Sequence, residues 1–479
     1  MKCISIAHGI PVDISCDIST LKSINALLIE CPEKRQFFDP VATHEAFNIC
    51  VEMLMNWLEI DDWNTQRMDI LKCMLEWCRN VCAGVKDNQI IATQCNVHKA
   101  IDQLVLGMIG KRNVASEDGF SKNASNLINM GVQALANMAT DNSETQSLLW
   151  SYFLNDSQLL SMFLLYATED EYKFALIWIY NSVHGNGLHC QMLVGSKIGL
   201  EIVSQLLKIF SESQEGLSFD ASYACLKSLI SNDLIPDIWT NLKLTDDNAV
   251  SDDHVVLLKA LDGVVSASTR KTSNSLYRTS VFLLNELISL TNAIVDNLKS
   301  AEPQLDPSVA HYCAFMVLIL QYMAVESQIV SVETKEQWLN LGLMKCLLDL
   351  LHGVNEIQPK ICKTTKDCDA LQSDIFFMIK CDIMKVIANM AFECKSAQDE
   401  VRNRGGIPLV LSHCVMDDLN PYLREYSLFA VRNIVHGNAE NQALISSLEA
   451  KKVVPNEMLD EMRVEAKIDA NGKLKLFPK

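Results

Sequence analysis

The stretch YSLFAVRNIVHGNAENQALISSLEA, residues 426–450, decides the fold. A helical run of apolar residues reaches Asn433, a polar break follows at His436-Gly437-Asn438, and the apolar character returns around Gln442. A catalytic loop and a joint between two units of a repeated scaffold both have this pattern. Its recurrence elsewhere in the chain separates these two interpretations.

Four other segments share the same order of features, and they begin at Leu75, Val132, Leu176 and Ile383. In every copy an apolar run reaches an asparagine, a short polar turn follows, and a glutamine leads into a second apolar run. The asparagines are Asn80, Asn137, Asn181, Asn389 and Asn433. The matching glutamines are Gln89, Gln146, Gln191, Gln398 and Gln442, which follow nine residues later in four copies and ten later in the third.

The spacing between copies indicates the class of repeat. Asn137 and Asn181, like Asn389 and Asn433, stand 44 residues apart, within the range of about 40–47 residues typical of armadillo and HEAT units. The residues Ile383, Val386, Ile387, Met390 and Ala391 form one apolar helical stripe. We therefore predict an all-α, armadillo- or HEAT-like helical solenoid.

Local signals refine the ends of the elements. Asn420-Pro421 predicts a helix start and Gly437 a helix stop. The segment VEAKIDANGKLKL, from Val464, alternates apolar and polar residues around Asn471-Gly472 and predicts a small C-terminal β-hairpin.

Polar breaks suggest how the chain divides. We predict N-terminal repeats over 1–245, a polar segment with a short helix over 246–275, C-terminal repeats over 276–455 and a tail over 456–479. A long polar stretch also predicts a mobile loop near 353–372.

Composition narrows the class of partner. The formal charge of −18 over 479 residues opposes a broad phosphate-binding surface, so nucleic acid is not expected. The 17 cysteines are scattered and mostly lie in apolar stretches, which predicts reduced core thiols rather than disulfides. The N-terminus has no signal-peptide pattern, and the longest apolar run, from Ala314, is too short to span a bilayer. An intracellular protein without membrane insertion is expected.

The repeated asparagines are the main candidates for partner binding. In an armadillo unit such a residue can offer its side-chain amide to an extended peptide, and it can equally cap the break between helices. Arg79 and Arg432 each precede one of these asparagines and either hold an acidic partner or pair with a carboxylate of a neighbouring repeat. The candidate partner-binding set is Arg79, Asn80, Asn137, Asn181, Asn389, Arg432 and Asn433.

Other kinds of site have weaker support. His184, His189 and Cys190 lie close together, yet His184 and His436 occupy equivalent turn positions and no fourth ligand is well spaced, so no metal is expected. No sequence motif of an enzyme is present, and neither a catalytic residue, a cofactor nor a small-molecule substrate is expected. The architecture is similar to nuclear-import adaptors, but Trp77 and Trp178 stand three residues before the asparagine rather than four, so the tryptophan ladder that holds basic cargo is missing.

The C-terminal residues resemble one family in particular. The pattern formed by Asn420, Pro421, Arg424, Glu425, Ala430, Arg432 and Asn433, together with RVEAKIDANGKLKL at the end, is similar to the C-terminal domain of the ataxin-10 family, over about 375–479. The resemblance covers about a fifth of the chain. It implies an armadillo-type fold, no catalytic activity, self-association through the C-terminal region, and a cytoplasmic protein found at the centrosome or midbody.

These observations lead to one functional hypothesis and an alternative. The first is a non-enzymatic scaffold of the ataxin-10 type that binds proteins, for which the family resemblance implies a role in cytokinesis and intracellular signalling. The alternative is an armadillo-type transport or chaperone-like adaptor that carries a protein client.

Overall fold

The computed structural model describes most of the chain. The described residues are 14–37, 39–58, 65–114, 118–213, 215–243, 251–267, 276–298, 307–357, 378–417, 420–448, 463–468 and 474–478. These residues divide into two compact units, Met1–Val264 and Val265–Lys479. The predicted boundaries at 245, 275 and 455 stay a prediction.

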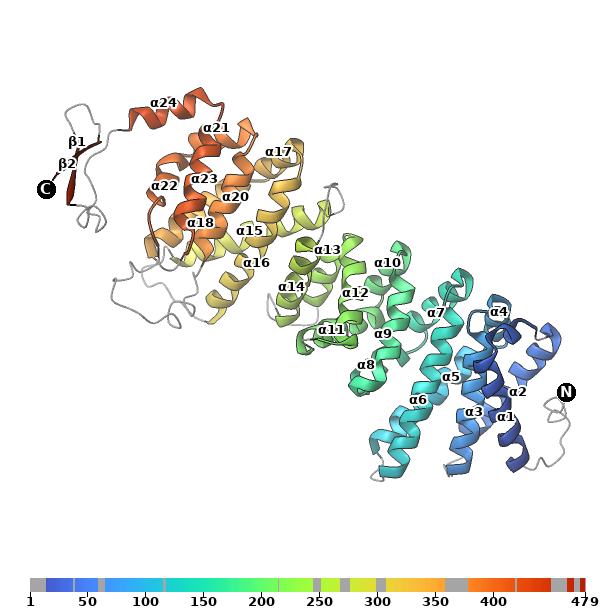
Figure 1. Ribbon diagram of the computed structural model, residues 1–479. Coiled ribbons are helices and arrows are strands. Elements are labelled where there is room, and N and C mark those ends of the chain that lie inside the picture. The colour runs from blue at the N-terminus through green and yellow to red at the C-terminus, as the bar shows by residue number, and fades with distance from the viewer. Residues whose placement is uncertain are drawn as a thin grey trace. The chain divides into compact units, whose positions relative to one another are not determined.

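The first unit is built from helices (Figure 1). They are α1 (Ile14–Glu30), the 3-10 helix η2 (Pro32–Phe37), α2 (Pro40–Leu58), α3 (Thr65–Cys82), α4 (Lys86–Gln94), α5 (Val97–Val114), α6 (Asp118–Ala139), α7 (Ser143–Asn155), α8 (Leu159–Tyr166), α9 (Glu169–Val183), α10 (Gly187–Gly195), α11 (Lys197–Glu212), α12 (Leu217–Ser231), α13 (Ile235–Lys243) and most of α14 (Asp252–Ser266).

The second unit is also helical, with one small sheet (Figure 1). Its elements are α15 (Tyr277–Leu298), α16 (Pro307–Ile329), α17 (Val332–Asn340), α18 (Leu343–Ile357), α20 (Ile379–Ala391), α21 (Lys395–Asn403), α22 (Gly406–Ser412), α23 (Leu423–Val435), α24 (Ala439–Ser447), β1 (Val464–Ile468) and β2 (Leu474–Pro478). The all-α prediction is confirmed.

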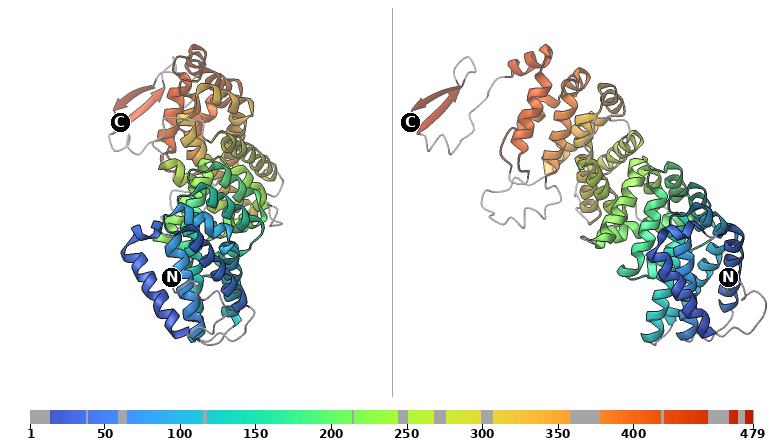
Figure 2. Two further views of the ribbon diagram at one scale, coloured as in Figure 1. Left: turned by 90° about the vertical axis from the view of Figure 1, so that its right-hand side faces the viewer. Right: turned by 45° about the vertical axis from the view of Figure 1, so that its right-hand side comes forward.

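Within each unit the long helices stack as successive layers. In the first unit α3 packs on α6, α6 on α9 and α9 on α12. In the second unit α16 packs on α20 and α20 on α23, as the views of Figure 2 also show. The predicted stripe of α20 faces this core, because Ile383, Val386, Ile387, Met390 and Ala391 are all fully buried. The layers therefore share a core by burying both sides of each inner helix.

The helix α16 is the most apolar of the long helices. Its stretch Tyr312–Ile329 has a mean hydropathy of 1.3 and is long and apolar enough to cross a membrane by length and composition. About half of that stretch (56%) is buried in the protein, and α16 contacts both α15 and α20. Core packing accounts for its apolar composition.

The predicted C-terminal hairpin is confirmed. The strands β1 and β2 pair antiparallel, with Val464 opposite Pro478 and Ala466 opposite Leu476. The predicted turn at Asn471-Gly472 lies outside the described residues. So does most of the predicted loop at 353–372, although its first residues belong to α18, which continues to Ile357.

The predicted start of α23 is wrong in detail. Asn420 does not cap α23, which begins at Leu423 after Tyr422 in the left-handed region (φ 65°). The side-chain oxygen of Asn420 instead accepts a hydrogen bond from the backbone N–H of Lys380 at 3.1 Å. Asn420 therefore satisfies the first turn of α20, in the preceding layer.

Candidate functional site: the corners between layers

Each repeated asparagine lies near the C-terminal end of a long helix, in α3, α6, α9, α20 or α23. In all five corners the fourth residue after the asparagine has a positive φ: Gly84 (74°), Asp141 (57°), Gly185 (67°), Glu393 (52°) and Gly437 (68°). A left-handed residue stops an α-helix and turns the chain. The predicted stop at Gly437 is confirmed, and the five breaks share one backbone geometry.

The glutamine of the first corner joins two layers. The side-chain nitrogen of Gln89 lies 3.1 Å from the carbonyl oxygen of Cys82 in its own corner. It also lies 2.7 Å from the carbonyl of Asn137 and 3.0 Å from that of Thr140, both at the end of the next layer helix, α6. The last carbonyls of a helix have no partner within the helix. Gln89 therefore supplies donors to two helix ends at once.

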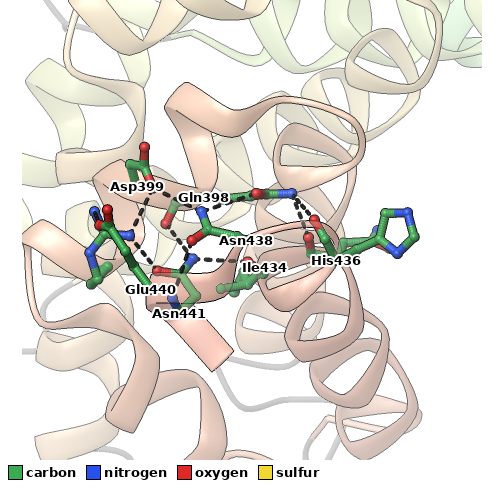
Figure 3. Close-up of polar contacts among 9 residues, drawn as sticks. Gln398, Asp399, Ile434, His436, Asn438, Glu440 and Asn441 are labelled. Atoms are coloured by element: carbon green, nitrogen blue, oxygen red, sulfur yellow. Dashed lines mark hydrogen bonds and ion pairs between the residues drawn. The ribbon is translucent and has the colours of Figure 1, made fainter. Parts of the chain in front are cut away.

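The same arrangement recurs in the second unit (Figure 3). The side-chain nitrogen of Gln398 lies 3.2 Å from the carbonyl oxygen of Ala391, 2.9 Å from that of Asn433 and 3.1 Å from that of His436. Gln398 is buried. Neighbouring Asn438 donates to the side-chain oxygens of Gln398 and Asp399 and so holds the amide in place.

The asparagine side chains make the reciprocal contact, toward the preceding layer. Asn137 donates to the carbonyl of Arg79 at 3.0 Å, and Asn433 donates to the carbonyl of Ala388 at 2.9 Å. Asn389 likewise donates to the carbonyl of Ala324 at 2.9 Å. The asparagine thus reaches back one layer and the glutamine reaches forward one layer.

The third corner differs from the sequence-based prediction, which matched Gln191 to Asn181. The residue that takes the glutamine position is Cys190, nine residues after Asn181, and Gln191 is exposed. The thiol of Cys190 points at the carbonyl of Val183, seven residues earlier, at 3.3 Å. Gln89 and Gln398 contact carbonyls at that same separation. The glutamine position of a corner is therefore identified by its separation of nine residues from the asparagine and not by its residue type.

The cluster around Cys190 is occupied by internal contacts. His189 is buried, and its Nδ1 lies 2.8 Å from the carbonyl of Ser182. His184 is exposed and lies beside Tyr180, with the ring centroids 4.9 Å apart and the ring planes tilted by 35°. Burial raises the pKa of the Cys190 thiol to about 11, so the thiolate that binds metals is disfavoured. Across the described ranges, no three His, Cys, Asp or Glu side chains gather in a way that could hold a metal ion.

A further corner residue was missed from the sequence. The ammonium group of Lys335, in α17, donates to the carbonyls of Asn389 (2.7 Å) and Phe392 (3.2 Å). These are the positions in α20 that match the contacts of Gln398 in α23. Burial lowers the pKa of Lys335. Position 326, nine residues before Lys335, holds glutamate instead of asparagine, so the Asn-to-Gln pattern gave no signal here.

The two candidate arginines differ in their surroundings. Arg79 donates to the side-chain oxygen of Asn80 at 3.0 Å and, across to α6, to that of Gln133 at 3.1 Å. Its inter-repeat partner is therefore an amide rather than the expected carboxylate. Arg432, on α23, is exposed. Asn80 and Asn433 are buried.

Asn181 contributes its backbone to its corner. Its carbonyl accepts a hydrogen bond from the side chain of Gln146 at 2.7 Å. Trp77 and Trp178, the aromatics nearest the predicted groove positions, are buried. They belong to the core and do not form a peptide-binding ladder.

One exposed depression adjoins the corners of the second unit. Ser327, Gln328, Asn389, Phe392 and Phe429 line it, and its volume is about 380 Å³. Phe392 and Phe429 remain 50% and 38% exposed. Of the candidate asparagines, the structure thus places Asn389 beside an open apolar surface.

Stacked helices joined by these reciprocal corners define an armadillo-like helical-repeat protein. Residues 379–477 match the family model of the spinocerebellar ataxia type 10 protein domain. Over these residues the chain is similar to proteins of the ataxin-10 family.

Two relatives show how the similarity is distributed. The ataxin-10 homolog of Dictyostelium discoideum is 40% identical over 96 residues, which cover 20% of this chain and 16% of that protein. Human ataxin-10 is 22% identical over 351 residues, which cover 70% of this chain and 68% of that protein. The alignments of higher identity with the Dictyostelium and yeast relatives span less than a quarter of those proteins.

Solved structures show a looser likeness. A designed armadillo repeat protein in complex with a (KR)4 peptide is 16% identical, and the match covers 68% of this chain and 98% of that chain with a TM-score of 0.24.

Proposed function

We propose that the chain is a non-enzymatic interaction scaffold of the ataxin-10 type, which binds segments of other proteins and acts in cell division and intracellular signalling. Similarity to the ataxin-10 family supports this class, and the family resemblance suggests the cytoplasm, with the centrosome or midbody as sites of action. No nucleic acid, cofactor, metal or small-molecule substrate is part of the proposal.

The observation that carries the proposal is the exposed aromatic surface beside Asn389. The corner amides are engaged in joining layers, whereas Phe392 and Phe429 stay exposed next to a depression. Aromatic side chains are enriched in protein interfaces because they bury a large area with few rotatable bonds. The proposed partner is an extended segment with an apolar side chain that fits between these two rings.

The test is partner capture by the full-length chain. Phe392→Ala and Phe429→Ala remove the exposed rings but keep the backbone carbonyl of Phe392 that Lys335 binds. Leu188→Ala, at another exposed apolar residue (65%), is the matched control. Proximity labelling in dividing cells identifies candidate partners, and binding is then measured with purified segments. We expect the two phenylalanine variants to lose at least about tenfold in affinity. Unchanged binding by folded variants would contradict the proposal.

We propose in addition that the C-terminal repeats self-associate. Among the residues that the structure describes, α23 is the last long helix of the second unit, and it exposes Leu428 and Phe429. Exposed apolar side chains that lie together mark interaction surfaces. A mass that rises with concentration in light scattering is the expected result. A monomer mass up to tens of micromolar would defeat this part of the proposal.

A further inference from the structure

The side chain of Arg79 is held in place between the neighbouring layer helices α3 and α6. Its Nε and Nη2 each donate to the side-chain oxygen of Asn80 at 3.0 Å, and its Nη1 donates to that of Gln133 at 3.1 Å. Its backbone carbonyl accepts a hydrogen bond from the side chain of Asn137 at 3.0 Å. A guanidinium has five N–H donors, so these three hydrogen bonds leave two of them for another acceptor.

The charge of Arg79 has no counter-ion in this corner. Among the residues that the structure describes, its side chain donates to amide oxygens and takes part in no ion pair. The carboxylate of Glu76, three residues earlier on α3, lies 3.9 Å from the ammonium group of Lys72. Burial lowers the pKa of Arg79; Glu76 opposes this shift and Arg35 adds to it. A half-buried cation without a counter-ion is unfavourable, because water solvates it only in part.

Another arginine of the same unit shows how the fold compensates such a charge. Nη1 of Arg112 lies 2.8 Å and 3.0 Å from the two carboxylate oxygens of Glu171. Both of these side chains are nearly buried, with exposed fractions of 9% and 5%. Arg112 thus has its counter-ion within the chain, whereas Arg79 is half-buried and its described partners are neutral amides. Arg79 is therefore open to a carboxylate that another molecule supplies.

We infer that Arg79 binds an aspartate or glutamate side chain of a partner protein, on the face formed by α3, α6 and α9. The site belongs to the first unit and does not depend on the proposed surface beside Asn389. The two remaining N–H groups of Arg79 donate to the carboxylate, while Asn80 and Gln133 keep the guanidinium in place. A side chain that is already oriented loses little conformational entropy when the partner binds.

The next layer determines what else the partner segment carries. Ile177 and Tyr180, on α9, are half-buried and stand at the positions that Gln133 and the arginine position hold relative to their own asparagines. The helix α6 packs against both α3 and α9. Packed helices lie about 8–10 Å apart, and an extended chain advances about 3.3 Å per residue. The segment should therefore have an apolar residue about five or six positions from its acidic one.

The charge of the whole chain favours one acidic side chain over a polyanion. The formal net charge is −18 at pH 7, and binding of nucleic acid or an anionic membrane needs clustered basic residues. One oriented guanidinium beside an apolar layer instead fits a single carboxylate in a segment that is otherwise uncharged.

Selection from a random peptide library tests the site on the full-length chain. Peptides selected by the wild type should share an acidic residue at one position and should bind Arg79→Gln at least about tenfold more weakly. Replacement of that acidic residue by its amide should weaken binding to the wild type by a similar factor, which tests the contact without altering the protein. Arg79→Glu should select lysine or arginine at the same position, because the charge of the site is reversed.

Lys99→Glu is the matched control, since Lys99 is exposed on α5 and the charge changes by the same amount as in Arg79→Glu. It should select the same peptides as the wild type, and circular dichroism checks that all variants fold. Equal peptide preferences of the wild type and both Arg79 variants would overturn the inference, as would a selection without acidic peptides. Peptides that depend on Phe392 and Phe429 but not on Arg79 would support the other surface and overturn this site.

Discussion

The side-chain nitrogen of Gln398 lies 2.9 Å from the backbone carbonyl of Asn433, in the next layer of the stack. In return, the side chain of Asn433 donates to the carbonyl of Ala388 in the layer before it. The two residues that repeat most clearly in the sequence thus form hydrogen bonds between adjacent layers. The separation between the asparagine and the glutamine is similar in every repeat because each helix end has backbone carbonyls that need hydrogen-bond donors.

Gln398→Ala should destabilise the second unit. The change leaves the carbonyls of Asn433 and His436 without their side-chain donor, and a buried polar group without a partner costs about 1–3 kcal/mol. We expect a loss of about 2 kcal/mol in the free energy of unfolding, measured by urea denaturation.

Gln442→Ala is the control for that measurement. Gln442 has the same place in the last corner, but it is exposed and donates to Val435 of its own corner. Its replacement should change stability by less than about 0.5 kcal/mol. Equal effects of the two replacements would show that the inter-layer bonds contribute nothing specific.

Lys335→Met should also lower the free energy of unfolding. Methionine fills a similar volume, but it cannot donate to the carbonyls of Asn389 and Phe392. We expect a loss on the order of 2 kcal/mol, and a smaller loss for Lys335→Gln, which restores the donor used in the other corners. A Met variant as stable as the Gln variant would argue against a corner role for Lys335.

The helical class and the corners could be predicted because both leave local signals. The apolar stripe of α20 and the recurring Asn-to-Gln spacing come directly from the geometry of a helix and its end. The partners of the corner residues could not be predicted, because they are backbone carbonyls of helices 35 or more residues away. Such acceptors have no residue type for the sequence to reveal.

The third corner shows the limit of matching by residue type. The sequence suggests Gln191, whereas the structure assigns the position to Cys190. Gln191→Ala should therefore leave stability within about 0.5 kcal/mol of the wild type. Gln146→Ala should cost about 1 kcal/mol, because Gln146 binds the carbonyl of Asn181. Thermal unfolding of the two variants decides the assignment, and a larger effect at Gln191 would reverse it.

His98 should make the first unit sensitive to acid. Burial lowers the pKa of His98 to about 4, and its Nδ1 is buried with no hydrogen-bond partner among the described residues. The unfolded chain, with a histidine pKa near 6.5, binds a proton first as the pH falls. The contribution of neutral His98 to the free energy of unfolding is therefore fully present above pH 6.5. It is lost progressively as the pH falls to 4, by on the order of 3 kcal/mol.

His98→Leu should flatten that part of the pH profile. The variant cannot take up the proton, so its free energy of unfolding should fall less between pH 6.5 and 4 than that of the wild type. His184→Leu, at an exposed histidine, is the control and should leave the profile as it is. Parallel wild-type and His98→Leu profiles would exclude His98 as the source.

The proposed binding surface was only partly visible in the sequence. Asn389 was a candidate, but Phe392 and Phe429 belong to no repeated pattern in the sequence. Conversely, Asn80 and Asn433 matched the pattern but are buried in the joints. Exposure is a property of the stacked layers, and it cannot be deduced from one helix at a time.

Hydrogen–deuterium exchange of the full-length chain with Gln398→Ala tests the central claim most directly. If Gln398 fastens one layer to the next, amide protection should fall in 423–435 and at the end of α20, and should remain unchanged in the first unit. Unchanged protection in α20 and α23, combined with lost binding of a partner, would contradict the account and make Gln398 a recognition residue.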